Sequence, residues 1–137
     1  MKIGFTCGAF DLLHAGHALM LKECRELCDY LIVGLQDDPS VNRPNKNKPI
    51  QSLPERYELL QAIKYVDEIK LYKTEEDLVN LLKTTKIDIR FVGMDWKNKE
   101  YTGKGIIPVH FNSRSHSYST TELRDRVYRT EKARRNE

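Results

Sequence analysis

The sequence predicts an α/β fold, built as one doubly wound parallel sheet of about five strands with flanking helices. Two observations lead to it. Short apolar runs alternate along the chain with longer segments whose apolar residues recur at helical spacing. A length of 137 residues suffices for one hydrophobic core but not for two domains. Alternation of this kind is typical of βαβ units with right-handed crossovers, so we expect a single Rossmann-like domain.

Each strand is predicted where the chain is apolar enough to be buried on both faces, and each helix where apolar residues recur with a period of 3.6. In chain order we expect a strand over 2–6, a helix over about 14–27, a strand over 30–35, a helix over 54–63, a strand over 68–72, a helix over 75–85, strands over 89–92 and 107–111, and a helix over 119–128. The folded domain should then cover 1–130, followed by a basic, solvated tail over 131–137 that frays.

Composition narrows the class of protein. The chain has three cysteines, an odd number, and no signal peptide, which together predict a reducing, cytoplasmic location. It has no apolar stretch long enough for a membrane span, so we expect no membrane association. The net charge of +3 suits a small anionic substrate, and it is too weak to predict nucleic-acid binding.

The most informative segment runs from Cys7 to His17, with the sequence CGAFDLLHAGH, directly after the first predicted strand. Residues three apart share one face of a helix, so His14 and His17 should point at one object. A helix that opens after a glycine-containing turn presents free backbone N–H groups and partial positive charge. Gly8 allows close approach of a ligand or a positive φ, and Gly16 clears space beside the imidazoles. The pattern predicts a phosphate site with two imidazole donors.

The same segment could instead hold two solvated histidines or half of a zinc site. No carboxylate or cysteine has an obvious ligand spacing to the pair, and Cys24 and Cys28 fit a helix core better. Asp11 has three open roles, since it could orient an imidazole, bind a metal ion through water or cap the helix.

Four segments together resemble the cytidylyltransferase family of the HxGH nucleotidyltransferases, and within it the glycerol-3-phosphate cytidylyltransferases. They are 8–17 (GAFDLLHAGH), 64–68 (KYVDE), 93–96 (GMDW) and 114–121 (RSHSYSTT). The resemblance implies transfer of CMP from CTP to a phosphorylated small alcohol, with release of pyrophosphate. It also implies Mg²⁺ bound with CTP, a homodimer, and no nucleic-acid partner.

The resemblance also implies roles for individual residues, at the carboxyl ends of the strands where such sheets bind ligands. The catalytic set is His14, His17, Lys46 and Arg114. The nucleotide-binding set is Cys7, Gly8, Ala9, Phe10, Asp11, Gly16, Lys48, Asp95, Ser119, Thr120 and Thr121. Substrate contacts are expected from Arg56, Asp37, His116 and Trp96, and a water-mediated metal contact from Asp11.

Two of these segments could have a purely structural role. The long loop over 37–53 could be a solvated basic loop, and the choice between Lys46 and Lys48 stays open. Ser119 and Glu122 form a capping-box pattern that needs no ligand, although the same helix start can also bind phosphate.

The chain departs from the family pattern at His116, Ser117 and Tyr118, at Lys64 and at Met94. The first of these departures leads us to expect a changed acceptor preference, with His116 in a specificity role. Two hypotheses of different class follow: an active nucleotidyltransferase, in which phosphoethanolamine, an amino-acid-derived phosphate or ATP could replace the expected substrates, or a nucleotide-binding module that has lost the reaction.

Overall fold

Five strands form one parallel sheet in the order β3-β2-β1-β4-β5 in the computed structural model, which describes residues 1–136. The strands are β1 (Ile3–Gly8), β2 (Tyr30–Gln36), β3 (Glu68–Tyr72), β4 (Ile89–Gly93) and β5 (Val109–Asn112). Every neighbouring pair is parallel, and β1 lies at the centre. The predicted doubly wound α/β fold is therefore confirmed.

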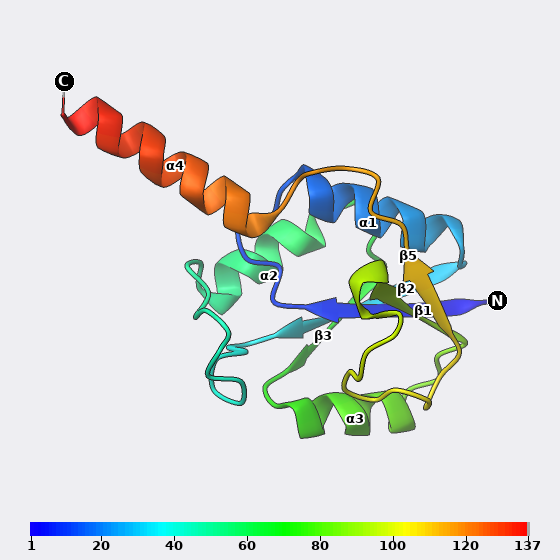
Figure 1. Ribbon diagram of the computed structural model, residues 1–137. Helices are drawn as coiled ribbons and strands as arrows, with labels where there is room; N and C mark the ends of the chain where they lie inside the picture. The colour runs from blue at the N-terminus through cyan, green and yellow to red at the C-terminus, as the bar shows by residue number, and fades with distance from the viewer. Residues whose placement is uncertain (137) are drawn as a thin grey trace.

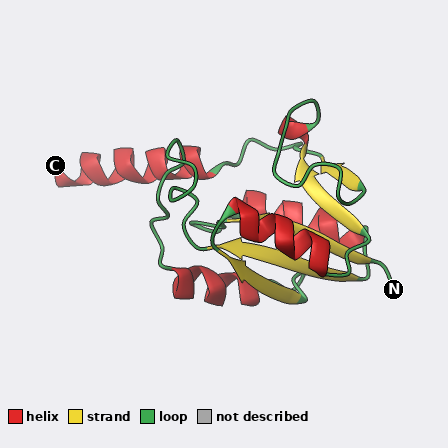
Figure 2. Ribbon diagram, turned by 90° about the horizontal axis from the view of Figure 1, so that it is seen from below, coloured by secondary structure: helices red, strands yellow, loops and turns green. Residues whose placement is uncertain are grey.

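Helices cover both faces of this sheet (Figure 1). They are α1 (Ala15–Glu26), α2 (Leu53–Gln61), α3 (Glu75–Thr84) and α4 (Thr120–Arg135), with one short 3₁₀ turn, η1 (Met94–Trp96). The first two pack on one face and α3 on the other, while α4 projects from the body (Figures 1 and 2). No helix within residues 1–136 combines the length and apolar composition that crossing a membrane would need.

The core has two layers, because successive side chains of a strand point to opposite faces. Leu31, Val33 and Leu35 of β2 belong to the cluster that includes Leu21 and Leu60 of the first two helices. Ile32 belongs to the opposite cluster, with Leu78 and Leu82 of α3. The sheet is thus buried on both sides, which explains the continuous apolar run of β2.

Most element boundaries differ from the sequence prediction by one or two residues, and the end of α4 differs by more. Strand β5 begins at Val109 and not at residue 107, since Pro108 has no N–H to give to a ladder. Helix α4 continues to Arg135, where we expected an end at 128 and a frayed tail from 131. Its second half is exposed, and the i,i+4 ion pairs Arg129–Asp125 and Arg135–Glu131 support it locally.

The winding direction of the sheet reverses between β1 and β4, since β2 and β3 lie on one side of β1 and β4 and β5 on the other. Ligands of open α/β sheets bind beyond the carboxyl ends of the strands at such a point. Gly8 and Gly93 are the last residues of the two central strands. The site should therefore lie above these two glycines.

Candidate active site

The turn after β1 has a strained and tightly held backbone. Phe10 and Leu12 have φ angles of 51° and 50°, in the left-handed region that non-glycine residues rarely adopt. The positive φ that we allowed for Gly8 is therefore corrected, because the turn uses these two neighbours instead. Residues kept in such conformations are held there by their surroundings, and the surroundings are polar contacts from the 37–53 loop and α2.

Asp11 and Gln51 connect this turn to the loop. The Asp11 carboxylate accepts hydrogen bonds from the backbone N–H groups of Ile50 and Gln51, both at 2.9 Å. The Gln51 side chain in turn accepts from Leu12 N–H at 2.8 Å. Asp11 is therefore not the helix cap that one of our three alternatives assigned to it.

Arg56 of α2 also holds this turn, through hydrogen bonds to backbone carbonyls. Its side chain is almost fully buried, at 2% exposure, and donates to four backbone carbonyls rather than to any carboxylate. The acceptors are the carbonyl oxygens of Ala9, Gln36, Asp37 and Gln51. We expected a substrate contact from Arg56 and Asp37. In the structure Arg56 joins the turn, the end of β2 and the loop, which is a positioning role. Asp37 contributes only its backbone carbonyl to this network, so its substrate contact stays a prediction.

His14 and His17 open α1 as an N-terminal capping pair. His14 is the N-cap, and its Nδ1 accepts from Gly16 N–H at 3.0 Å. The Nδ1 of His17 accepts from His14 N–H at 3.1 Å. A neutral imidazole whose Nδ1 accepts carries its proton on Nε2. The ring centroids lie 4.0 Å apart. Each ring therefore keeps one N–H donor on Nε2, and that of His14 lies 3.1 Å from Thr120 Oγ1, which can accept it.

Both imidazoles are kept neutral by their surroundings. Burial lowers the pKa of His17 to about 4, with His14 acting in the same direction and Asp11 against it. Burial also lowers the pKa of His14, helped by His116 and Arg114. Near neutral pH the pair is therefore an uncharged donor pair in the free protein.

The lowered pKa of His17 predicts a pH dependence of stability. The unfolded chain protonates this histidine below its ordinary pKa of 6.5, whereas the native state does so only near 4. The unfolded state thus binds more protons in this window, so the free energy of unfolding should be highest above pH 6.5 and fall towards pH 4. The loss from His17 should approach about 3 kcal/mol. Urea unfolding at stepped pH measures it, and His17→Gln should flatten the slope. An equally steep slope in that variant would contradict the assignment.

The position between the histidines, Gly16, has no room for a side chain. A Cβ there would lie 2.8 Å from Cε1 of His14 and 3.0 Å from Cε1 of His116. Any larger residue would therefore displace the His14 ring. The same contact shows that His116, from the segment before α4, lies beside the histidine pair.

Three cavities with shared lining residues lie at this end of the sheet, and two of them contain histidines of the pair. The turn cavity, of about 370 Å³, is lined by Gly8, Ala9, Phe10, Asp11, His17, Gln36, Pro39, Arg43, Lys46, Asn47, Pro49, Thr120 and Arg124. The histidine cavity, of about 360 Å³, is lined by His14, Gly16, His17, Met20, Gly93, Met94, Asp95, Asn112, Ser113, Arg114, His116, Tyr118, Ser119, Thr120 and Thr121. They share His17 and Thr120, so the two cavities are contiguous through the histidine pair.

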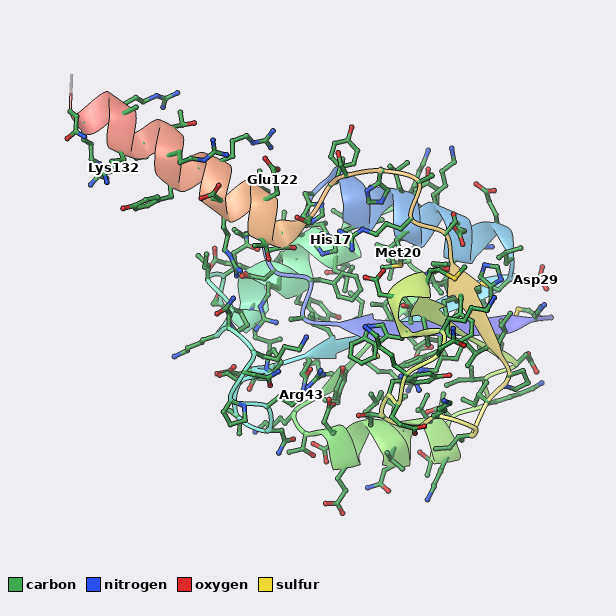
Figure 3. The ribbon with its side chains drawn as sticks, in the orientation of Figure 1. His17, Met20, Asp29, Arg43, Glu122 and Lys132 are labelled. Atoms are coloured by element: carbon green, nitrogen blue, oxygen red, sulfur yellow. The ribbon has the colours of Figure 1, made fainter. Side chains whose placement is uncertain are left out.

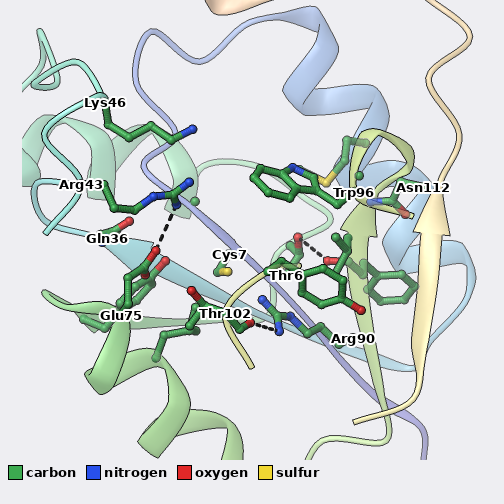
Figure 4. A pocket seen from close by; sticks show the side chains of 18 of the residues that line it. Thr6, Cys7, Gln36, Arg43, Lys46, Glu75, Arg90, Trp96, Thr102 and Asn112 are labelled. Carbon is green, nitrogen blue, oxygen red and sulfur yellow. Dashed lines mark hydrogen bonds and ion pairs between the residues drawn. The ribbon is translucent and has the colours of Figure 1, made fainter. Parts of the chain in front are cut away.

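The third, the sheet cavity, is the largest at about 700 Å³ and lies over the carboxyl ends of β1 and β4 on the α3 side (Figure 4). Its polar lining includes Thr6, Gln36, Arg43, Glu75, Arg90 and Asn112, and its apolar lining includes Cys7, Met20 and Trp96. The residues that also line the turn cavity are Gly8, Gln36, Arg43 and Lys46, and those that also line the histidine cavity are Met20, Gly93 and Asn112. Figure 3 shows Arg43 on the loop side of this region and His17 and Met20 on α1.

Most of the predicted site residues line these cavities, but not always the same one. Lys46 lines two of them, whereas Lys48 lines none of the three. Arg114 lines the histidine cavity, where it pairs with Asp95 at 3.4 Å, and so lies apart from Lys46. Cys7 and Trp96 line only the sheet cavity of the three. Ser119 caps α4 by accepting from Glu122 N–H, the one bond of the predicted capping box that forms.

Sequence reasoning missed two arginines. No role was predicted for Arg124, yet it lines the turn cavity one helical turn after Thr120. That spacing of four on a helix was the available signal. Arg90 lies in the sheet cavity, and no local pattern pointed to it. Arg43, from the predicted basic loop, lines two cavities and pairs with Glu75 at 3.0 Å.

Within residues 1–136, no group of three or more His, Cys, Asp or Glu side chains is arranged to hold a metal ion. Mg²⁺ needs no such group, because it binds through one or two carboxylates together with substrate phosphates. Asp11 is the carboxylate that lines the turn cavity, and its oxygens retain lone pairs for a metal-bound water.

A parallel sheet with imidazole donors at a helix start, next to cavities lined by lysine and arginine, is the arrangement expected of an α/β protein that binds a phosphorylated ligand. The chain belongs to the cytidylyltransferase-like family, whose profile matches residues 5–126. It is 38% identical over 131 residues to the bifunctional protein HldE of Helicobacter pylori strain HPAG1, covering 94% of this chain. It is 40% identical over 107 residues to the HldE of Campylobacter concisus strain 13826, covering 77% of this chain. The chain spans only 28% and 22% of the lengths of these two relatives.

Solved structures agree with the fold. The lipopolysaccharide core biosynthesis protein of Thermoplasma volcanium GSS1 superposes with a TM-score of 0.61 at 27% identity, covering 95% of this chain and 88% of that protein. Pantothenate synthetase of Thermus thermophilus has a TM-score of 0.61 at 13% identity, covering 92% of this chain and 64% of that protein, which shows the fold alone. The family of the sequence prediction is confirmed, while its glycerol-3-phosphate branch stays a prediction.

Proposed function

We propose that this chain transfers CMP from CTP to a phosphorylated small molecule, releasing pyrophosphate. The observation that carries the proposal is the histidine pair, whose two Nδ1 atoms are occupied by backbone N–H groups. Each ring is thereby fixed with its proton on Nε2, at the junction of the turn and histidine cavities, and the Nε2–H of His14 would turn from Thr120 Oγ1 to a bound phosphate. Preorganised neutral donors of this kind stabilise charge that develops on a phosphoryl group.

The reaction needs no general base in this proposal. A phosphomonoester oxygen of the acceptor is already anionic and attacks the α-phosphorus of CTP in line, while the bond to the pyrophosphate oxygen breaks. The electron pair leaves with pyrophosphate, so atoms and charge balance without a proton transfer. His14 and His17 donate to the α-phosphate, and Lys46 with Arg124 holds the departing phosphates from the turn cavity.

We infer the roles of the remaining predicted residues from the cavities that they line. Arg114, Asp95, Thr121 and His116 would contact the nucleoside in the histidine cavity. Mg²⁺ bound to the triphosphate would neutralise its charge, and Asp11 would hold one of the waters of that ion. A homodimer remains a prediction, which sedimentation of the purified protein tests.

The deciding experiment measures pyrophosphate release from each of the four nucleoside triphosphates with a panel of phosphorylated alcohols, amines and acids. Release that requires both CTP and an acceptor supports the proposal. Release with ATP instead would change the donor and keep the reaction. Nucleotide binding without release from any pairing would contradict an enzyme and favour a binding module.

The two lysines of the loop offer a matched pair of variants. Lys46→Ala should lower kcat/KM by about 100-fold, because Lys46 lines the turn and sheet cavities and would balance triphosphate charge. Lys48→Ala removes the same charge two residues away, outside the three cavities, and should change kcat/KM by less than about threefold. Steady-state kinetics with varied CTP checks both. Equal losses would mean that only the net charge of the loop matters.

A further inference from the structure

The mechanism proposed above leaves one buried charge without a function. Arg90 of β4 is 5% exposed and lies in the strand IRFVG, where its neighbours are apolar. Its Nη1 donates to the backbone carbonyl of Thr102 at 2.6 Å, a neutral acceptor. Its Nε is buried and has no hydrogen-bond partner. A buried arginine with an unpaired donor costs stability unless something compensates its charge.

No side chain supplies that compensation. In the part of the chain that the structure describes, no carboxylate forms an ion pair with Arg90, and Glu75 of the same cavity is paired with Arg43. Cys7 and Tyr72 lie beside Arg90, and burial raises the pKa of both the thiol and the phenol, so both stay neutral. The ring of Tyr101 lies 5.3 Å from the guanidinium carbon and offers only its π face.

The surrounding chain is built to cover this arginine. Gly103 has a φ of 77°, and a Cβ there would lie 3.0 Å from Nη1 of Arg90 and 2.4 Å from Leu82. Only glycine therefore lets the loop that carries Thr102 close over the guanidinium. Figure 4 shows Arg90 across the sheet cavity from Arg43 and Lys46, with Cys7 between them. One end of the cavity thus carries Arg43 and Lys46, and the other end carries the uncompensated guanidinium of Arg90.

Resting on the proposed function, we propose that the sheet cavity binds the non-reacting end of the acceptor and that Arg90 there binds a carboxylate. The acceptor is then a phosphorylated hydroxy or amino acid and not a neutral phosphorylated alcohol. The guanidinium fork matches a carboxylate in geometry and charge. Arg90 lies three residues before the end of β4, which sets its backbone roughly 10 Å below the rim. Acids of three to six carbons therefore test how deep into the cavity the carboxylate has to reach.

The test compares acceptors that differ only in the carboxylate. The pairs are 3-phosphoglycerate with glycerol 3-phosphate, O-phosphoserine with phosphoethanolamine, and 6-phosphogluconate with glucitol 6-phosphate. We expect the acid of at least one pair to have a kcat/KM at least about tenfold higher than its neutral partner. In Arg90→Met the ratio should fall to within about threefold of unity through the KM of the acid, with the KM of CTP unchanged. Arg126→Met, at an exposed arginine of α4, should keep the preference of the unmodified protein.

Thermal unfolding supplies a readout that does not need turnover. Without ligand, Arg90→Met should melt at the same temperature as the unmodified protein or higher, since removing an uncompensated buried charge costs little. The phosphorylated acids should raise the Tm of the unmodified protein and not that of the variant. If Arg90→Met does not fold, Arg90→Gln replaces it in both the kinetic and the thermal measurements.

Equal kcat/KM within every pair, or an acid preference that survives Arg90→Met, would overturn the inference. If no acceptor supports pyrophosphate release, the proposed function fails, and the Tm shift alone decides. A shift that depends on Arg90 then upholds an acid-binding cavity, and no shift rejects it.

Discussion

Replacing His14 with asparagine is expected to lower kcat by about two to four orders of magnitude and to leave the free energy of unfolding nearly unchanged. The asparagine Oδ1 can accept from Gly16 N–H as the Nδ1 of His14 does, because asparagine is among the best N-cap residues. What the variant lacks is the Nε2–H donor. His17→Gln follows the same logic at N3 of the helix, where glutamine retains the acceptor for His14 N–H.

His14→Ala separates capping from catalysis. It should lose the same turnover and, in addition, about 1 kcal/mol of stability, since neither the donor nor the cap remains. Single-turnover kinetics and urea unfolding on the same preparations measure the two effects. Near-normal turnover in His14→Asn would show that the histidine pair only caps α1.

Arg56→Met is expected to destabilise the protein by roughly 3 kcal/mol or more, the largest stability effect that we predict. Methionine fills a similar volume but leaves the buried carbonyl of Gln36 and the partly buried carbonyls of Ala9 and Gln51 without their donor, each at a cost of about 1 kcal/mol or more. Because the same bonds hold the turn after β1, the strained conformation of Phe10 should also relax.

Urea unfolding of Arg56→Met measures this loss, and Arg126→Met is the matched control at an exposed position, expected to lie within about 0.5 kcal/mol of the unmodified protein. A loss below about 1 kcal/mol in Arg56→Met would show that water replaces the guanidinium. Arg56 would then be free for the substrate contact that the resemblance implies.

The fold was predictable because local pattern and burial agree along most of the chain. β2 is apolar at nearly every position, and the structure buries it between helices on both faces, as a central parallel strand requires. The end of α4 could not be predicted from apolar periodicity. Its last turns bury no side chain and depend on exposed ion pairs, which leave no hydrophobic signal.

The candidate site was predictable where its residues are close in sequence. The spacing of His14 and His17 specifies a shared direction before any tertiary contact is known. Arg56 and Arg90 could not be assigned a role in this way, since the role of a single arginine depends on partners that are distant in sequence. Arg56 meets carbonyls from three other segments, and Arg90 meets a loop that Gly103 allows to close.

The candidate site has a rigid part on the sheet and a part that can move with helix α4. Every residue from 125 to 136 is exposed, and Lys132 extends into solvent (Figure 3), so the helix is anchored to the body through its first turns. Those turns carry Thr120 and Arg124, whereas the histidines stand on a helix packed against the sheet. Elements with few buried contacts open at low free energy. We therefore expect α4 to move about a hinge at its start when pyrophosphate leaves. The sheet and the histidine pair would keep their positions during this movement.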